Sequence, residues 1–190
     1  TLFSSITLYS YSTAQTYCSV SGTDCDVDDE ITNVTIGSIN NTTTCGTNGY
    51  TSYTSPTATL NTGVGYPISV TVGSGGTEHV AVWIDYNQNG TFDTTEFTSI
   101  GSGNGVTISS TITIPGTATP GITVMRVRLR YNTALTDADA CLSYTYGETE
   151  DYEVTIGVGT ACSGAPTAGT ASAPTGICSG VNFDLTLTGY

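Results

Sequence analysis

Residues 123–131 read TVMRVRLRY, and this run indicates the fold class of the whole chain. Apolar side chains alternate with arginines, which is the period-two pattern of a β-strand that buries one face. One face holds Met125, Val127, Leu129 and Tyr131, and the other holds Val124, Arg126, Arg128 and Arg130. These arginines are the only Lys or Arg residues in the sequence, so all of this positive charge lies in one row.

The same alternation recurs along the chain, with turn signals at intervals of about eight to twelve residues. Asn48-Gly49, Asn89-Gly90 and Pro115-Gly116 are among the dipeptides that indicate turns. The predicted strands are 4–11, 31–39, 49–54, 66–72, 78–86, 96–100, 105–114, 122–131 and 150–158. We therefore expect an all-β fold, an antiparallel β-sandwich of the jelly-roll or immunoglobulin-like type, with strand-like extensions at both termini.

The charge balance excludes several classes of partner. The 190 residues include 16 Asp and Glu against three Arg and no Lys, which gives a formal net charge of −13. Such a surface cannot neutralise phosphates, so we expect no nucleic acid and no anionic membrane as a partner. No apolar run reaches the roughly 18 residues of a membrane-spanning helix, so we expect no membrane insertion.

Composition also predicts how the chain is organised. We expect a boundary near residues 157–165, because the sequence there is typical of a linker. The expected parts are a strand extension (1–16), a sandwich (17–158), and a linker with a C-terminal strand segment (159–190), which is either a partial immunoglobulin-like repeat or a donor strand. Residues 2–14 fit the end of a signal peptide or a strand, and the alternation of Ile6 and Leu8 with polar residues favours the strand.

The six cysteines indicate disulfides. They form an even set without a C-x-x-C pair, and the sequence has one histidine, so zinc and redox sites are disfavoured. Disulfides persist in oxidising compartments, which predicts an extracellular protein. Spacing alone leaves the connectivity open, and the pairs that we expect are Cys25 with Cys45, Cys18 with Cys141, and Cys162 with Cys178.

A complete calcium-loop pattern lies at residues 85–96, DYNQNGTFDTTE. It fits D-x-[DN]-x-[DN]-G-x5-E, in which oxygen ligands recur along a twelve-residue loop and the central glycine allows a sharp turn. The candidate ligands of Ca2+ are Asp85, Asn87, Asn89, the carbonyl of Thr91, Asp93 and Glu96. Because a strand-like stretch precedes the loop and no amphipathic helix follows it, we expect a structural site and not a sensor. The alternative is an Asn-Gly hairpin turn with incidental acidic residues.

A second acidic group lies late in the chain. Glu148, Glu150 and Asp151 are a candidate second acidic site, and they are also candidate partners for the three arginines. The alternative is a solvated acidic turn. The acidic runs at 26–30 and 137–139 are more typical of soluble loops than of metal sites.

Several of these motifs together resemble the GEVED domain, a module of secreted bacterial multidomain proteins. The matching pieces include VWIDYN at 82–87, NGTFD at 89–93, MRVR at 125–128 and GETEDY at 147–152, and the resemblance covers roughly residues 17–157. Thr149 stands where the namesake motif has Val. The segment from Cys162 resembles the beginning of an immunoglobulin-like repeat. The resemblance implies a β-sandwich with an extracellular, surface-associated role, and it supplies no activity.

The sequence predicts a non-enzymatic protein. It has no H-E-x-x-H, G-x-S-x-G or phosphate-loop motif, and its single imidazole, His79, lies in a predicted strand. We expect a structural or adhesive module, a calcium-stabilised subunit of a surface filament in which neighbours exchange strands and form a homopolymer. The alternative is a carbohydrate-binding accessory module that uses Trp83 and some of the 12 tyrosines as stacking platforms.

Glycosylation is a further expectation. Four asparagines begin N-x-[ST] triplets, and Thr94 follows an aspartate in an Asp-Thr pair typical of bacterial O-glycosylation. The candidate acceptors are Asn33, Asn40, Asn41, Asn89 and Thr94.

Overall fold

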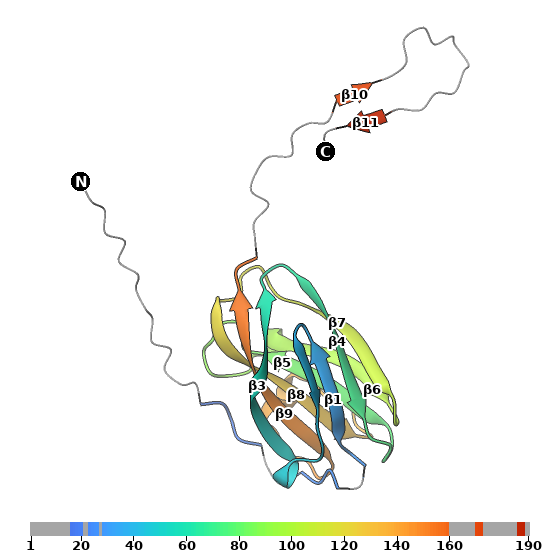
Figure 1. Cartoon of the computed structure of the whole chain (residues 1–190). Helices are drawn as coiled ribbons and strands as arrows, with labels where there is room; N and C mark the ends of the chain where they lie inside the picture. Colours follow the sequence, from blue (N-terminus) through green and yellow to red (C-terminus); the bar gives the residue numbers. More distant parts are fainter. Residues whose placement is uncertain (1–15, 21–22, 27, 160–169, 173–185, 189–190) are drawn as a thin grey trace, which may run out of the picture. The chain divides into compact units, whose positions relative to one another are not determined.

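The computed structural model describes residues 16–20, 23–26, 28–159, 170–172 and 186–188 (Figure 1). The chain divides into two units, residues 1–159 and 160–190. The predicted strand 4–11 and the predicted Cys162–Cys178 pair lie outside the described residues. In the second unit, β10 (Thr170–Ser172) pairs with β11 (Thr186–Thr188) in antiparallel fashion.

The first unit contains two β-sheets. One is four-stranded, in the order β2-β1-β4-β7, and all its pairs are antiparallel. Its strands are β1 (Ile31–Ile36), β2 (Ile39–Thr42), β4 (Gly65–Val72) and β7 (Thr107–Thr113). The predicted single strand 31–39 is in fact a hairpin, because the chain reverses at Gly37, whose φ of 58° favours glycine.

The other sheet is five-stranded, in the order β3-β9-β8-β5-β6. Its strands are β3 (Tyr50–Asn61), β5 (Glu78–Ile84), β6 (Phe97–Gly103), β8 (Gly121–Tyr131) and β9 (Gly147–Gly157). One pair differs from the predicted antiparallel pattern, since β3 and β9 run parallel. Side-chain alternation is the same for both strand directions, so the sequence pattern could not reveal this pair.

The two sheets pack face to face, which confirms the predicted sandwich. Their inner faces share one core of aliphatic side chains, with Ile31, Val34 and Ile68 from the four-stranded sheet and Val82 and Val127 from the five-stranded sheet. All five are at most 1% exposed. Three short 3-10 turns connect strands: η1 (Thr47–Gly49), η2 (Thr94–Glu96) and η3 (Asp137–Cys141). Nowhere in the described ranges is there a helix with the length and apolarity needed to cross a membrane.

The outer face of the five-stranded sheet is also covered. A small second core of Ala81, Trp83, Leu135 and Ala140 lies there, on the side away from the main core. Two predicted disulfides are confirmed. Cys18–Cys141 joins the N-terminal segment to η3 on this face, and Cys25–Cys45 joins two loops at the end where β1 begins.

Candidate calcium loop and acidic strand

The loop at 85–96 begins where β5 ends, and it winds around the carboxylate of Asp85. This residue is 0% exposed. Its Oδ1 accepts the amide of Asn89 at 3.2 Å, and its Oδ2 accepts the amide of Gly90 at 2.9 Å. Gly90 has a φ of 82°, a conformation that a side chain would strain. The tight turn that the pattern predicts at the sixth loop position is therefore present.

Glu96 closes the loop from its other end. Its Oε1 accepts the amide of Tyr86 at 2.7 Å, and its Oε2 accepts the amide of Asp93 at 2.9 Å. The second of these bonds belongs to a capping box at the start of η2. Burial raises the pKa of Glu96, and the amide hydrogen bonds act in the opposite direction. The carboxylate thus holds two distant parts of the loop together.

Three more predicted ligands meet at the exposed side of the loop. The side-chain amides of Asn87 and Asn89 donate to Asp93 Oδ2 at 2.8 and 3.0 Å. Asn89 Oδ1 accepts the amide of Thr91 at 2.8 Å. Within the described ranges, no three His, Cys, Asp or Glu side chains gather closely enough to hold a metal ion. The donor set is oxygen-only, which suits Ca2+, but coordination requires the Asn87 and Asn89 oxygens to turn inward and Glu96 to exchange amides for the ion.

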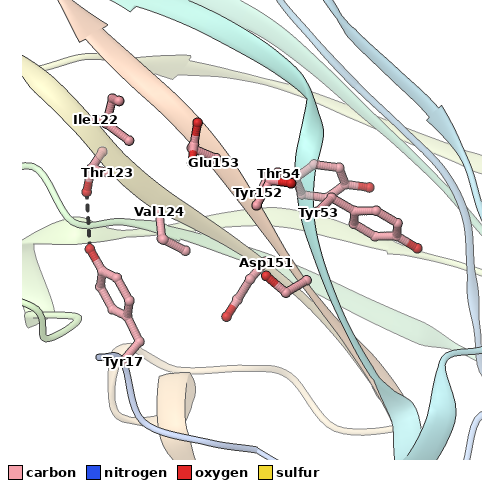
Figure 2. A pocket seen from close by; sticks show the side chains of 10 residues that line it. Tyr17, Tyr53, Thr54, Ile122, Thr123, Val124, Asp151, Tyr152 and Glu153 are labelled. Atoms are coloured by element: carbon pink, nitrogen blue, oxygen red, sulfur yellow. Dashed lines mark hydrogen bonds between the residues drawn. The ribbon is translucent and has the colours of Figure 1, made fainter. Parts of the chain in front are cut away.

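The N-terminal segment is joined to this loop, which the sequence pattern did not indicate. The Tyr17 hydroxyl donates to Asp85 Oδ2 at 2.8 Å and lies 3.3 Å from Thr123 Oγ1, the contact drawn in Figure 2. The Tyr17 ring also stacks on Phe92 of the loop, with centroids 5.0 Å apart. Thr123 in turn donates to the Asp85 carbonyl at 2.8 Å. Asp85 is therefore a junction between β5, β8 and the N-terminal segment.

A small cavity lies beside Tyr17 on the outer face of the sheet. It has a volume of about 210 Å³, and β3, β8 and β9 contribute to its walls. Figure 2 shows Tyr17 on one side of it and Thr54 and Tyr53 on the other, with Asp151 and Glu153 from β9 between them. Trp83 does not reach this surface. It is 0% exposed, because the η3 segment covers it and the Asp137 carbonyl accepts its indole N–H at 3.2 Å, so it cannot be the predicted stacking platform.

The arginine row lies on the outer face, under the covering segments. Arg126 forms a two-pronged ion pair with Asp151, at 2.7 and 2.8 Å, and its side chain is 1% exposed. It also donates to the carbonyls of Cys18 and Ala140, both at 2.9 Å. The predicted pairing of this arginine with an acid of the late motif is confirmed for Asp151. Arg126 thereby connects the sheet to both sides of the Cys18–Cys141 disulfide, through Cys18 itself and through Ala140, the neighbour of Cys141.

The other two arginines find different partners from those predicted. Arg128 is 0% exposed and donates to the Thr149 hydroxyl at 2.9 Å, to the Leu142 carbonyl at 2.8 Å and to the Asp139 carbonyl. Arg130 lies 3.6 Å from the Asp139 carboxylate, and its side chain is 28% exposed. Arg128 also lies over the Tyr144 ring, 4.4 Å from its centroid.

Glu148 and Glu150 do not join Asp151, so the predicted second acidic site is wrong. Successive residues of a strand face opposite ways, and the two glutamates therefore lie inside the sandwich, opposite Leu129 and Val127 in the β8 register. Both are 0% exposed. Glu148 accepts the amides of Ile31 at 2.8 Å and Gly46 at 2.7 Å. The Tyr152 hydroxyl donates to Glu150 at 2.8 Å.

These buried positions change the proton affinity of both groups. Burial raises the pKa of Glu148 to about 7, although the amides of Ile31 and Gly46 favour the charged form. Burial likewise raises the pKa of Glu150 to about 7, against the effect of the Tyr152 hydrogen bond. A signal for this placement existed in the sequence. Tyr152, Val154 and Ile156 alternate in phase with the two glutamates, and this apolar face is the one that a sandwich buries.

The candidate glycosylation residues lie on two surfaces. Asn33 and Asn41 are partly exposed and Asn40 is exposed on the β1–β2 hairpin. Asn89 and Thr94 are exposed on the 85–96 loop. Asn33 Nδ2 donates to Asn40 Oδ1 at 3.1 Å, and Asn41 Nδ2 donates to the Tyr152 hydroxyl at 3.2 Å. His79 is partly buried in β5.

The fold and its covalent links define the general class of this protein. A two-sheet sandwich with two disulfides is consistent with an extracellular module. Residues 79–155 match the family model of the GEVED domain, the family that the motifs of the sequence predicted. The match suggests a secreted module of multidomain proteins. No curated protein matches the chain. The predicted immunoglobulin-like repeat falls mainly outside the described residues.

Proposed function

We propose that this chain is a non-enzymatic structural module of the bacterial cell surface, that Ca2+ in the 85–96 loop stabilises it, and that neighbouring copies exchange strands to form an adhesive filament. The observation that carries the proposal is the position of Asp85. This residue is the first of the calcium pattern, and it also contacts the N-terminal segment through Tyr17 and β8 through Thr123. An ion at this residue would stiffen the junction through which the N-terminal segment transmits force to the sheet.

The ion would be held by oxygen atoms of Asp85, Asn87, Asn89, Thr91, Asp93 and Glu96. Asp85 already has the amide hydrogen bonds that wind such a loop around its first ligand. Asn87 and Asn89 are exposed and Asp93 is partly exposed, Thr91 would offer its main-chain carbonyl, and Glu96 is buried at 3% exposure. Only carboxylate, amide and carbonyl oxygens are offered, which favours a hard cation such as Ca2+ over Zn2+ or Cu2+.

Calcium removal tests the first half of the proposal. We expect chelator to lower the melting temperature of the purified full chain and to accelerate proteolysis between residues 85 and 96. Asp93→Asn should reduce the calcium-dependent part of this stability, whereas Asp26→Asn, an exposed acidic position outside the loop, should leave it unchanged. A melting curve that neither chelator nor Asp93→Asn alters contradicts the calcium role.

Strand exchange rests on the open edges of the sandwich. The sheets end on β2, β7, β3 and β6, and no further described strand pairs with their outer sides. The predicted donor is residues 4–11, which alternate apolar and polar side chains. Electron microscopy of the full chain should show fibres, and Ile6→Asp with Leu8→Asp should abolish them. Thr7→Asp, on the opposite face of the donor, is the matched control. A wild-type chain that stays monomeric at high concentration contradicts assembly.

Glycan binding is the second candidate, and the cavity beside Tyr17 favours it. The cavity combines tyrosine side chains with the carboxylates of Asp151 and Glu153. Rings with neighbouring acceptors are what a sugar subsite needs. Glu153→Gln should weaken binding on a glycan array without altering the melting temperature, since Asp151 alone is tied to Arg126. An array without any hit removes this candidate. Glycans attached at the exposed Asn40 or Thr94 remain compatible with either function.

A further inference from the structure

Two buried carboxylates near the start of β1 and β5 lack a hydrogen-bond donor for three of their four oxygen atoms. Glu78 is 0% exposed and Asp29 is 3% exposed. Both carboxylate oxygens of Glu78 and Oδ1 of Asp29 lack a hydrogen bond, and no other fully buried side-chain N or O atom of the described residues does. The two carboxyl groups lie against each other, and after burial the side-chain hydrogen bond with Asp29 and its charge raise the pKa of Glu78. Because buried polar groups are almost always paired, this pair requires a physical explanation.

The backbone holds the two side chains in this position. The loop between β4 and β5 runs alongside residues 28–30, where the amide of Gly73 donates to the Glu30 carbonyl at 2.9 Å and the amide of Gly75 donates to the Asp28 carbonyl at 3.1 Å. A Cβ at Gly73 would lie 2.0 Å from the Asp28 carbonyl oxygen, so only glycine permits this approach. The contact between Asp29 and Glu78 is therefore built into the fold.

Other carboxylates at the same end of the sandwich are satisfied by backbone amides. Glu30 accepts the amide of Cys45 at 2.9 Å, and Glu148 accepts those of Ile31 and Gly46. Both oxygens of Glu78 and Oδ1 of Asp29 have no such donor. Side-chain cations cannot compensate them either, because the three arginines of the sequence bind on the outer face of the five-stranded sheet. The sole histidine, His79, follows Glu78 in β5 and so faces the opposite side of that sheet.

We propose that Asp29 and Glu78 are the carboxylate ligands of a divalent-cation site of the calcium class, separate from the 85–96 loop. Two carboxylates balance the charge of such an ion, and their oxygens are the hard donors that it selects. The site lies at the opposite end of β5 from Asp85, about 20 Å away by the rise of a strand. Burial, then the hydrogen bond and the charge of Asp29, raise the pKa of Glu78 to about 8.

Calcium stoichiometry of the full chain tests this site. At pH 8, isothermal titration calorimetry with CaCl2 should show that Glu78→Gln loses one equivalent relative to wild type, and that Asp29→Asn loses the same one. Asp137→Asn, a matched loss of one negative charge on a partly exposed residue of η3, should keep the wild-type stoichiometry. Asp93→Asn should weaken only the calcium equivalent that binds at the 85–96 loop. If the loop binds no calcium, Asp93→Asn has no effect; if Asp29 and Glu78 bind none, Glu78→Gln and Asp29→Asn have no effect.

Two outcomes would overturn the inference. One is a wild-type stoichiometry and affinity in folded Glu78→Gln and Asp29→Asn, where near-UV circular dichroism verifies the fold. The other is a wild-type chain that binds no Ca2+, Mg2+ or Mn2+ at either place while Glu78→Gln raises its melting temperature at pH 8. The second result would mean that the two carboxyl groups share a proton and hold no ion.

Discussion

The two faces of β9 carry the same kind of side chain and use it in opposite ways. On the outer face, Asp151 pairs with Arg126, which also donates to the carbonyls of the two covering segments. On the inner face, Glu148 and Glu150 lie in the core without a cation, and they have backbone amides or tyrosine hydroxyls as partners. The same acidic motif therefore builds a charged junction on one side and a proton-binding interior on the other.

This difference shows that the environment of a carboxylate decides its role. An ion pair with two short bonds offsets the cost of removing both charges from water. Hydrogen-bond donors without a cation offset this cost only in part. The uncompensated cost of burying the charge raises the pKa of Glu148 and of Glu150 to about 7.

Removal of the Cys18–Cys141 disulfide, which fixes the N-terminal segment on the outer face, should cause the largest loss in the free energy of unfolding. It closes a loop with a sequence separation of 123 residues, and the chain-entropy relation gives about 5 kcal/mol for a loop of that length. Cys25–Cys45, with a separation of 20, should cost about 3 kcal/mol. Urea unfolding of the two double-serine variants measures both values. Equal losses would contradict the dependence on loop length from which the two values are taken.

Arg126→Met should destabilise the chain by about 4 kcal/mol, because it leaves Asp151 buried without its cation. Arg130→Met is the matched control at the exposed end of the same row, and its loss should stay below about 1 kcal/mol. Urea denaturation under identical conditions provides the comparison. Similar losses for the two variants would contradict the special role of the buried pair.

The inner face should make stability fall as pH rises. In the folded chain the pKa of Glu150 is about 7, above its usual value near 4.5, so its contribution is complete below pH 4.5 and is lost as pH rises through 7. The expected loss between pH 4.5 and 8 is about 3 kcal/mol for this group. Glu150→Gln should remove it, since an amide can still bond the Tyr152 hydroxyl. Thermal melts at intervals of pH, in chelator, reveal the difference between variant and wild type. If the melting temperatures of variant and wild type differ by the same amount at every pH, the pKa of Glu150 is not raised and the side chain is solvated.

Calcium at the loop should give the smallest effect. With free calcium at about ten to a hundred times the dissociation constant, linkage predicts a stabilisation of about 1–3 kcal/mol. Differential scanning calorimetry with and without CaCl2 measures it. Asp93→Asn should reduce the gain and leave stability in chelator nearly unchanged, because an Asn oxygen can still accept hydrogen bonds at this exposed position. A gain that survives this substitution would have to come from elsewhere, and Glu78→Gln then identifies the source.

Much of the fold could be predicted from local pattern. The alternation in TVMRVRLRY located β8 to within one residue at its start, and most other strands were located to within three residues of either end. The winding of the 85–96 loop around Asp85 also followed from its motif. These features depend on residues close together in the chain, whose geometry is set by short-range sterics and hydrogen bonds.

The partners of the charged groups could not be predicted in the same way. Asp29 meets Glu78, Tyr17 meets Asp85, and Arg128 meets the Leu142 carbonyl, each across a long separation in sequence. The pattern of β9 did place Glu148 and Glu150 on one side and Asp151 on the other, but it did not say which side another element would cover.

The amino-acid sequence by itself determined the β-sandwich class and the loop that winds around Asp85, and it left the pairing of the cysteines open. Only the tertiary structure decided the two disulfides, which carboxylate pairs with an arginine, which carboxylates lie in the core and which meet each other. The physical reason is that a strand's period of two is a local property, whereas desolvation and pairing depend on what packs against each face.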